Sequence, residues 1–360
     1  MPPVSPADGP VAVTGASGSI GSWIVRDLMQ QGYRVRACVR DLSNPAKVDH
    51  LEAMNDDPSL RGSVTLCEAD LGKPGSYDEP FRGCCAVVHA GATVGYGGES
   101  PQQVYDGCFT EVGHVLDSVE RAGSVRRFVF TSSIAAVIDP VRDGYVYTEQ
   151  DWFSECNPAG WRGHCKDENI ATDWRMAYSF AKMRAERMAY GRAAASGGAY
   201  EAMAILPVHT VGPVMCKNHD QKASWQNIIK NMLKNNAGID KRDPMLWNMG
   251  DVRDVGAAHR LCLESSVAGN GSRYILGAAD RSHEIPFWQL RLKLMQLFPM
   301  VAHVSGGPER PTMDRPRCYC LKAINELGLR PLPIDQSLRD TGDSYWRLGM
   351  LPQLGAASKL

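Results

Sequence analysis

The chain has 360 residues, with 39 Lys and Arg against 40 Asp and Glu and a formal net charge of −1. This length suits one large α/β domain with a smaller companion, and the balanced charge disfavours nucleic acid and anionic membranes as partners. No apolar run approaches membrane-spanning length, and Met1–Pro10 lacks the basic and apolar regions of a signal peptide. We therefore expect a cytoplasmic protein.

The eleven cysteines form neither a disulfide framework nor a metal-binding pattern. Cys84 and Cys85 are adjacent, and no CxxC pair occurs. We expect reduced cysteines that pack as small hydrophobic side chains. His164 and Cys165 are neighbours, but no second ligand pair lies at a spacing suited to zinc, so the sequence predicts no metal.

The first half of the chain alternates short apolar strands with helical patterns. Strands separated by helices are typical of parallel βαβ units, so the pattern predicts an α/β fold with a Rossmann-type doubly wound parallel sheet. The predicted strands are Val11–Thr14, Tyr33–Val39, Val64–Cys67, Ala86–His89, Phe128–Thr131, Met203–Leu206 and Ser272–Leu276. The predicted helices cover about Ser19–Gln31, Pro101–Ala122, Thr172–Ala194, Ser224–Lys234, Val252–Glu264, Pro286–Phe298 and Leu321–Leu327.

A glycine-rich turn joins the first strand to the first helix. Its first glycine permits the sharp turn, the second lets the backbone approach a pyrophosphate, and the third lets the helix pack against the sheet. Glycine triplets also occur in turns that bind nothing, but the strand before this one and the helix after it favour a dinucleotide. The predicted contacts, at the positive end of the helix, are Gly15, Ser17, Gly18, Ser19, Ile20 and Gly21.

The residues after the second strand indicate which dinucleotide binds. Arg40 lies 19 residues after Gly21, where the adenosine ribose is expected, and Lys47 follows seven residues later. A guanidinium there pairs with a 2′-phosphate, whereas an acidic residue would select NAD. Asp41, which directly follows Arg40, is an acidic residue and argues for NAD, but the two basic residues favour NADP(H). Further cofactor contacts are expected at Asp70, Leu71 and Ala90.

A Tyr–Lys pair is the candidate catalytic machinery. Tyr178 and Lys182 are spaced i, i+4 on a predicted helix and therefore share one face. Ser133 ends the fifth strand, and ligands of open α/β sheets bind beyond the carboxyl ends of the strands. A lysine cation favours the tyrosine phenolate, the tyrosine exchanges a proton with a carbonyl or alcohol oxygen, and a serine hydroxyl holds that oxygen.

These segments resemble the extended short-chain dehydrogenases/reductases, and among them the group of dihydroflavonol, cinnamoyl-CoA and aldehyde/ketone reductases. The matching stretches are Val13–Trp23, Gly32–Asp41, Val125–Ser133, Tyr178–Lys182, Leu206–Pro213 and Asp251–His259. The resemblance implies that Lys182 also holds the nicotinamide ribose. It further implies that Ser133, Tyr178 and Lys182 form a catalytic triad. By the same resemblance, Arg40 and Lys47 bind the 2′-phosphate, and Pro207 helps to seat the nicotinamide.

Two departures from that group concern the substrate. Ser133 and Tyr178 are 45 residues apart, which is longer than usual there, and the excess falls in Trp152–Trp174. Where flavonoid reductases carry an asparagine that holds the substrate ring, this chain has Ile138, which disfavours a flavonoid. We expect Ile138 and Trp174 to contact an apolar or aromatic small molecule.

Residues 8–206 with 250–279 are predicted to form the NADP-binding domain, and residues 207–249 with 280–350 the substrate-binding lobe. The polar stretch from about Asp139 to Thr172 is predicted to be irregular. It is either a wall or lid of the substrate pocket or a surface insertion that its tryptophans attach to the body.

Together these features predict an NADPH-dependent carbonyl reductase, or the reverse alcohol dehydrogenase, acting on a small molecule as a monomer or homodimer. One alternative is an NDP-sugar epimerase or dehydratase, which shares the fold and the Tyr–Lys pair but favours an acidic residue where Arg40 lies. The other is a non-catalytic NADP-binding protein. Proteins of that kind tend to lose the triad, which is present here.

Overall fold

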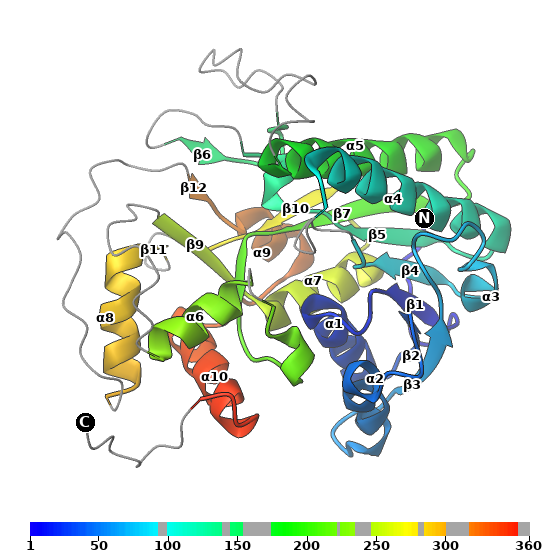
Figure 1. The fold of residues 1–360 in the computed structure, drawn as a ribbon. Coiled ribbons are helices and arrows are strands. Elements are labelled where there is room, and N and C mark those ends of the chain that lie inside the picture. The colour runs from blue at the N-terminus through cyan, green and yellow to red at the C-terminus, as the bar shows by residue number, and fades with distance from the viewer. Residues whose placement is uncertain are drawn as a thin grey trace.

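A computed structural model describes residues 1–92, 99–138, 145–153, 174–221, 224–234, 246–279, 284–299 and 317–351. Seven parallel strands form its central sheet, in the order β10-β7-β5-β4-β1-β2-β3 (Figure 1). This sheet confirms the predicted fold class, and every predicted strand lies within two residues of its observed ends. The strands are β1 (Val11–Thr14), β2 (Arg34–Val39), β3 (Ser63–Glu68), β4 (Ala86–His89), β5 (Arg127–Thr131), β7 (Glu201–Pro207) and β10 (Arg273–Leu276).

Helices cover both faces of the sheet (Figure 1). One face packs against α3 (Asp78–Phe81), α4 (Pro101–Ala122) and α5 (Trp174–Ala195). The other packs against α1 (Ser19–Gln30), α2 (Pro45–Glu52), α7 (Val252–Glu264) and α9 (Leu321–Leu327). Because both faces are covered, the central strands β1, β4 and β5 are buried along their whole length and are mainly apolar, whereas the edge strand β3 is partly exposed.

The order of strands reverses between β1 and β4, which creates the crevice where ligands of such sheets bind. The turn after β1 enters this crevice. Gly15 has a φ of 63°, and a Cβ there would lie 2.5 Å from the Cα of Gly91, which follows β4. Only glycine satisfies both the left-handed backbone and this close approach.

A second layer of structure follows β7. Strands β8 (His209–Val211), β9 (Leu246–Asp251) and β11 (Glu284–Pro286) form a small sheet in the order β11-β9-β8. Helices α6 (Trp225–Leu233), α8 (Phe287–Leu297) and α10 (Ile334–Arg347) share a separate apolar core with it. The sequence analysis predicted neither this sheet nor α10. Within the described ranges, no helix is long and apolar enough to span a bilayer.

Residues 145–153 are the described part of the stretch that was predicted to be irregular, and they contain a short strand, β6 (Val146–Tyr147), which corrects that expectation there. It pairs in parallel with β12 (Arg317–Cys318) from the last part of the chain. Two-residue strands leave no periodic pattern in a sequence, so only the pairing partner reveals them.

Helix α9 packs into the core of the large sheet rather than into the core shared by α6, α8 and α10.

Candidate active site at the carboxyl ends of the strands

The glycine-rich turn leaves the start of α1 open to an anion. Gly18 is the N-cap of α1, and no side chain caps the free N–H groups of the first turn. A Cβ on Gly21 would lie 2.2 Å from the carbonyl oxygen of Gly15. The turn therefore tolerates no side chain at that position, and its amide groups together with the helix dipole suit a phosphate.

The neighbouring loops meet this turn. The amide of Ala90 donates to the carbonyl of Thr14 at 3.3 Å, so the segment after β4 lies beside the end of β1. Leu71, after β3, has its Cδ1 atom 2.9 Å from where a Cβ on Gly91 would be. The Oδ1 atom of Asp70 accepts from the amide of Gly72 at 3.0 Å. The structure thus brings Leu71 and Ala90 to the same crevice as the glycines.

Arg40 and Lys47 are both exposed, the first directly after β2 and the second on α2. Arg40 makes no hydrogen bond or ion pair within the part of the chain that the structure describes. Asp41 is engaged by its own turn, because its Oδ1 accepts from the amide of Ser43 at 2.9 Å and from its hydroxyl at 2.6 Å. These hydrogen bonds, helped by the charge of Lys47, lower the pKa of Asp41. The guanidinium of Arg40 remains available for a ligand.

The elements that carry the predicted triad, α5 and the turn after β5, meet at the end of β5. Lys182, on α5, is buried, and its Nζ donates to the carbonyl of Thr131 at 3.0 Å. The same Nζ lies 5.8 Å from the centre of the Tyr178 ring. Ser133 begins a short 3-10 turn at the end of β5, and its Oγ accepts from the amide of Ala135 at 3.2 Å. Lys182 therefore links the strand that ends near Ser133 to the helix that carries Tyr178.

Lys182 is an unusual buried cation. Its single hydrogen bond within the described ranges goes to a carbonyl oxygen, and an ammonium has three donors. Its Nζ lies 4.9 Å from the centre of the Phe130 ring. Burial, with the charge of Lys182 as a second cause, lowers the pKa of His89 to about 3, so this neighbouring imidazole is neutral. Two donors of the ammonium are left for a ligand in the crevice.

A buried network that the sequence analysis missed supports α5. Glu186, one turn after Lys182, accepts from the hydroxyl of Ser132 at 2.7 Å and from that of Tyr190 at 2.8 Å. Arg273 on β10 pairs with the same carboxylate at 2.5 Å. The i, i+4 spacing that joins Tyr178 to Lys182 continues through Glu186, and this was the available signal. The network fixes the rotation of α5 against β5 and β10.

Pro207 ends β7 and is buried, and Ile138 is partly buried beside a cluster that includes Leu206 and Ile275. The guanidinium of Arg273 lies 3.6 Å from the centre of the Trp152 ring, and Phe153 packs edge-on against Phe180. The described start of the long stretch therefore packs on the body of the protein. The side chain of Trp174 and residues 154–173, which include His164 and Cys165, lie outside the described residues.

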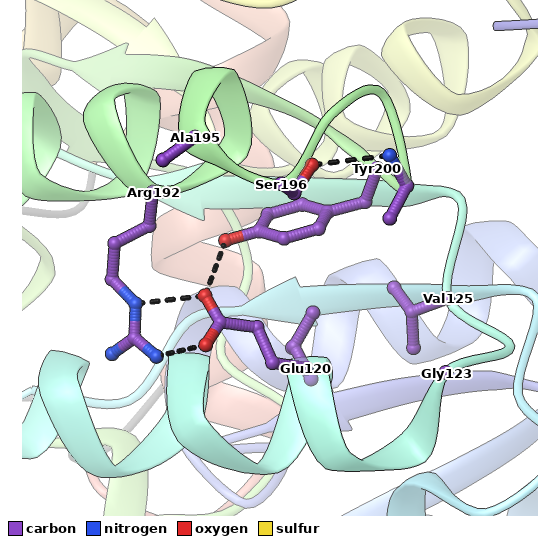
Figure 2. Close-up of a pocket in the computed structure, with 9 residues that line it drawn as sticks. Glu120, Gly123, Val125, Arg192, Ala195, Ser196 and Tyr200 are labelled. Carbon is purple, nitrogen blue, oxygen red and sulfur yellow. Dashed lines mark hydrogen bonds and ion pairs between the residues drawn. The ribbon is translucent and has the colours of Figure 1, made fainter.

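A hollow of about 470 Å³ lies elsewhere, between the ends of α4 and α5 (Figure 2). Glu120 in its wall accepts from Arg192 at 2.8 Å and from the hydroxyl of Tyr200 at 3.2 Å. Val125 and Tyr200, which also line it, precede β5 and β7. The hollow is thus at the amino ends of the strands, and ligands of open parallel sheets bind at the opposite edge. We do not assign it to the active site.

Comparison with known proteins defines the class. Residues 11–277 match the model of the NAD dependent epimerase/dehydratase family, and the chain belongs to this family. It is 30% identical over 344 residues to cinnamoyl-CoA reductase 2 of Arabidopsis thaliana, which covers 95% of this chain and 94% of that protein. It is 35% identical to dihydroflavonol 4-reductase of the same plant, over 56% of this chain and 50% of that protein.

Solved structures agree on the fold. The yeast methylglyoxal/isovaleraldehyde reductase Gre2 in complex with NADPH has a TM-score of 0.76 at 22% identity, over 95% of this chain and 99% of that one. The UDP-glucose 4-epimerase of Thermotoga maritima has a TM-score of 0.70 at 19% identity, over 94% of this chain and 98% of that one. The predicted resemblance to extended short-chain dehydrogenases/reductases is confirmed, and the relatives that match over their full length are named as oxidoreductases, as expected.

Proposed function

We propose that the protein is an NADPH-dependent reductase of aldehydes or ketones, or the corresponding alcohol dehydrogenase. The observation that carries this proposal is the buried Lys182, which lies beside Tyr178 and has donors left over at the end of β5. A buried ammonium is costly unless it is compensated, and a bound ribose and a tyrosine phenolate would compensate this one. Full-length relatives named as reductases support the same reading.

The cofactor-binding residues fit NADP(H). Bound NADPH would supply the hydride. The first turn of α1 and the glycine-rich turn would hold the pyrophosphate, with Asp70, Leu71 and Ala90 beside them. Arg40 and Lys47 would hold the 2′-phosphate, because both are exposed and the Arg40 guanidinium has no hydrogen bond to the described residues.

The proton-transfer residues act on one oxygen. The Tyr178 hydroxyl gives its proton to the carbonyl oxygen in reduction and takes one from the alcohol in the reverse direction. Ser133 donates a hydrogen bond to the same oxygen and stabilises its developing negative charge. Lys182 would hold the cofactor ribose, and its charge would stabilise the phenolate that Tyr178 becomes.

The substrate is proposed to be an apolar or aromatic small molecule. Pro207, Ile138 and the apolar cluster beside them support this preference. Residues 8–206 with 250–279 would bind the cofactor and residues 207–249 with 280–350 the substrate. Helix α9 packs on the large sheet and is the exception within the second range.

An NDP-sugar epimerase is the second candidate, because such an enzyme has the same fold. Two assays separate the candidates. One follows NADPH consumption with aromatic aldehydes, α-keto esters, cyclic ketones and cinnamoyl-CoA, and repeats the assay in reverse with the matching alcohols. The other denatures the purified protein to test for retained NAD and incubates it with UDP-sugars. Carbonyl-dependent NADPH oxidation is the expected result, whereas retained NAD with sugar interconversion would overturn the proposal.

A further inference from the structure

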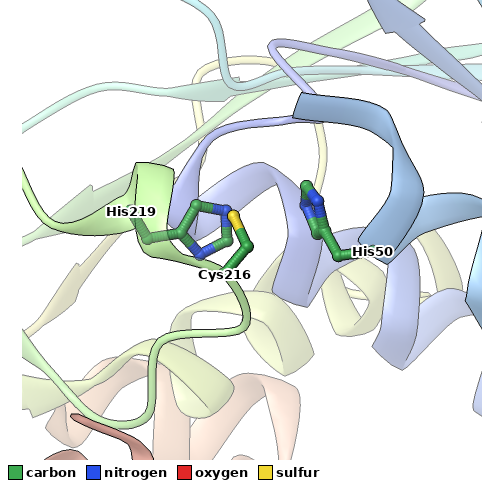
Figure 3. Close-up of side chains that lie close together, drawn as sticks. All are labelled: His50, Cys216 and His219. Atoms are coloured by element: carbon green, nitrogen blue, oxygen red, sulfur yellow. The ribbon is translucent and has the colours of Figure 1, made fainter. Parts of the chain in front are cut away.

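Three potential metal ligands meet behind the glycine-rich turn. His50 lies on α2, whereas Cys216 and His219 lie at a short 3-10 turn, Lys217–His219, in the segment after β8 (Figure 3). One ligand atom from each residue lies within 4.8 Å of the other two. More than 160 residues separate His50 from the other two, so no sequence motif announces the cluster.

His50 is held with one nitrogen free. Its Nε2 lies 2.8 Å from the hydroxyl of Ser22, and that hydroxyl gives its single proton to the carbonyl of Ala16 or Gly18, at 2.9 and 2.8 Å. With the Ser22 proton on a carbonyl oxygen, Nε2 of His50 carries the ring proton in this contact, and Nδ1 keeps a lone pair. Nδ1 is buried and has no hydrogen-bond partner within the described ranges. Proteins commonly prepare a metal-binding imidazole in this way.

His219 is held more loosely. Its Nε2 lies 3.2 Å from the carbonyl oxygen of Ser17, and its Nδ1 accepts from the amide of Met215 at 3.3 Å. Both contacts are long, so turning one nitrogen toward a cation costs little. Burial lowers the pKa of His219 to about 4 and also lowers that of His50.

We propose that His50, Cys216 and His219 bind a thiophilic divalent cation such as Zn²⁺, with the fourth position open to water. Two imidazoles and one thiolate suit zinc better than magnesium or calcium, which prefer oxygen ligands. On binding, the S–H bond of Cys216 breaks, a sulfur–metal bond forms and the proton passes to solvent. Ligand atoms around tetrahedral zinc are roughly 3.5 Å apart, so the side chains need to close by only about 1 Å.

The cation would tie α2 to the segment after β8. Ser22 and Ser17, which contact the two imidazoles, belong to the turn and first helix proposed to hold the cofactor pyrophosphate. The site therefore lies behind that turn. It does not depend on the proposed reductase activity, because metal binding is measured without cofactor or substrate.

Cobalt titration tests the site directly. The metal-free protein, kept reduced, is titrated with Co²⁺, and the near-ultraviolet thiolate-to-cobalt band is recorded with the visible d–d bands. We expect one Co²⁺ per chain in tetrahedral geometry, and its displacement by Zn²⁺. Cys216→Ser should abolish the thiolate band, whereas Cys67→Ser, at another partly buried cysteine, should leave it unchanged.

A positioning variant adds a second measurement. Ser22→Ala removes the group that holds His50, and the loss of such a supporting contact weakens metal affinity roughly tenfold or more. The variant keeps all three ligands, so the band should remain while the titration midpoint moves to higher Co²⁺. The proposal is overturned if the wild-type protein develops no thiolate band, or if the band survives Cys216→Ser.

Discussion

The two ends of strand β5 carry buried cations with opposite surroundings. Arg127 begins the strand, and its guanidinium donates to five carbonyl oxygens, among them those of Cys262 and Ser265, both at 2.7 Å. Lys182 lies at the other end and, within the described ranges, donates only to Thr131. Both side chains are almost fully buried. Arg127 thus has several acceptors within the fold, and the carboxylate of Glu201 lies 3.5 Å away, whereas Lys182 has one acceptor within the described residues and has donors left for a ligand.

Strand β2 repeats this contrast. Arg36, early in the strand, donates to the carbonyl of Pro80 at 2.9 Å and to that of Arg82 at 2.7 Å. Arg40, directly after the strand, has no such partner in the described part of the chain. In these two strands, Arg127 and Arg36 thus stabilise the fold, whereas Lys182 and Arg40, at the carboxyl ends, are available to a ligand. Substitutions at the two edges should therefore have different consequences.

The largest effect is expected from Tyr178→Phe. Loss of the proton donor should reduce turnover by about 10²- to 10⁴-fold, the range for general acid–base groups, while NADPH affinity is retained. Tyr200→Phe is the matched control at the other edge. It removes a 3.2 Å hydrogen bond to Glu120 and should leave turnover near normal. Steady-state kinetics with fluorescence titration of NADPH measure both. Near-normal turnover in Tyr178→Phe would remove the assignment.

Arg127→Met and Lys182→Met should separate stability from activity. Without Arg127, five carbonyl oxygens lose this donor, three of them in fully buried contacts, and we expect a loss on the order of 3–5 kcal/mol in the free energy of unfolding. Lys182→Met removes a cation with one partner, so it should reduce turnover strongly while stability falls much less. Urea unfolding measures the stability of both variants, and steady-state kinetics measure their turnover. Equal losses of stability would contradict the contrast between the two edges.

A buried acid extends the comparison to pH. Asp251 is paired with Arg253 at 2.8 Å, whereas Asp254 accepts from the amide of Leu332 at 3.0 Å and has no ion pair within the described residues. Burial raises the pKa of Asp254 to about 7. In the unfolded chain its pKa is about 3.9. The protonated carboxyl therefore favours the folded state at low pH, and this contribution is lost as pH rises toward 7.

Asp254→Asn keeps the acceptor for Leu332 without the charge. The variant should be more stable than the wild type above about pH 8, on the order of a few kcal/mol, and this advantage should vanish near pH 4. Denaturant unfolding across this range measures the difference. Asp56→Asn, at an exposed carboxyl, is the control and should show little dependence on pH. A constant offset for Asp254→Asn at every pH would refute the explanation.

The smallest effect is expected from Arg40→Asp. Loss of a charge-assisted pair with the 2′-phosphate should weaken NADPH binding by about 10- to 100-fold and change NADH binding far less. Arg34→Asp, at an exposed position at the start of the same strand, should leave both affinities unchanged. Calorimetric titration gives the affinities. Equal affinity of the wild-type protein for the two cofactors would rule out this role for Arg40.

The sequence determined the large sheet, the glycine-rich turn and the Tyr178–Lys182 pair. Each depends on short-range spacing: alternation of strand and helix, the close approach that only glycine permits, and the i, i+4 geometry of one helix. Helix α10 escaped prediction because small and polar residues fill part of its buried face. Thr341 and Ser344 accept from the amides of Gly212 and Val214, at 2.8 and 3.1 Å.

Only the tertiary structure decided the contacts between distant segments. It joined Glu186 to Ser132 and Arg273, and it brought His50 to Cys216 and His219. Neither of these polar clusters was therefore expected from the sequence, from which no metal was predicted. Periodicity reports which face of an element is buried, but it does not report which other element covers that face, and polar clusters depend on that second fact.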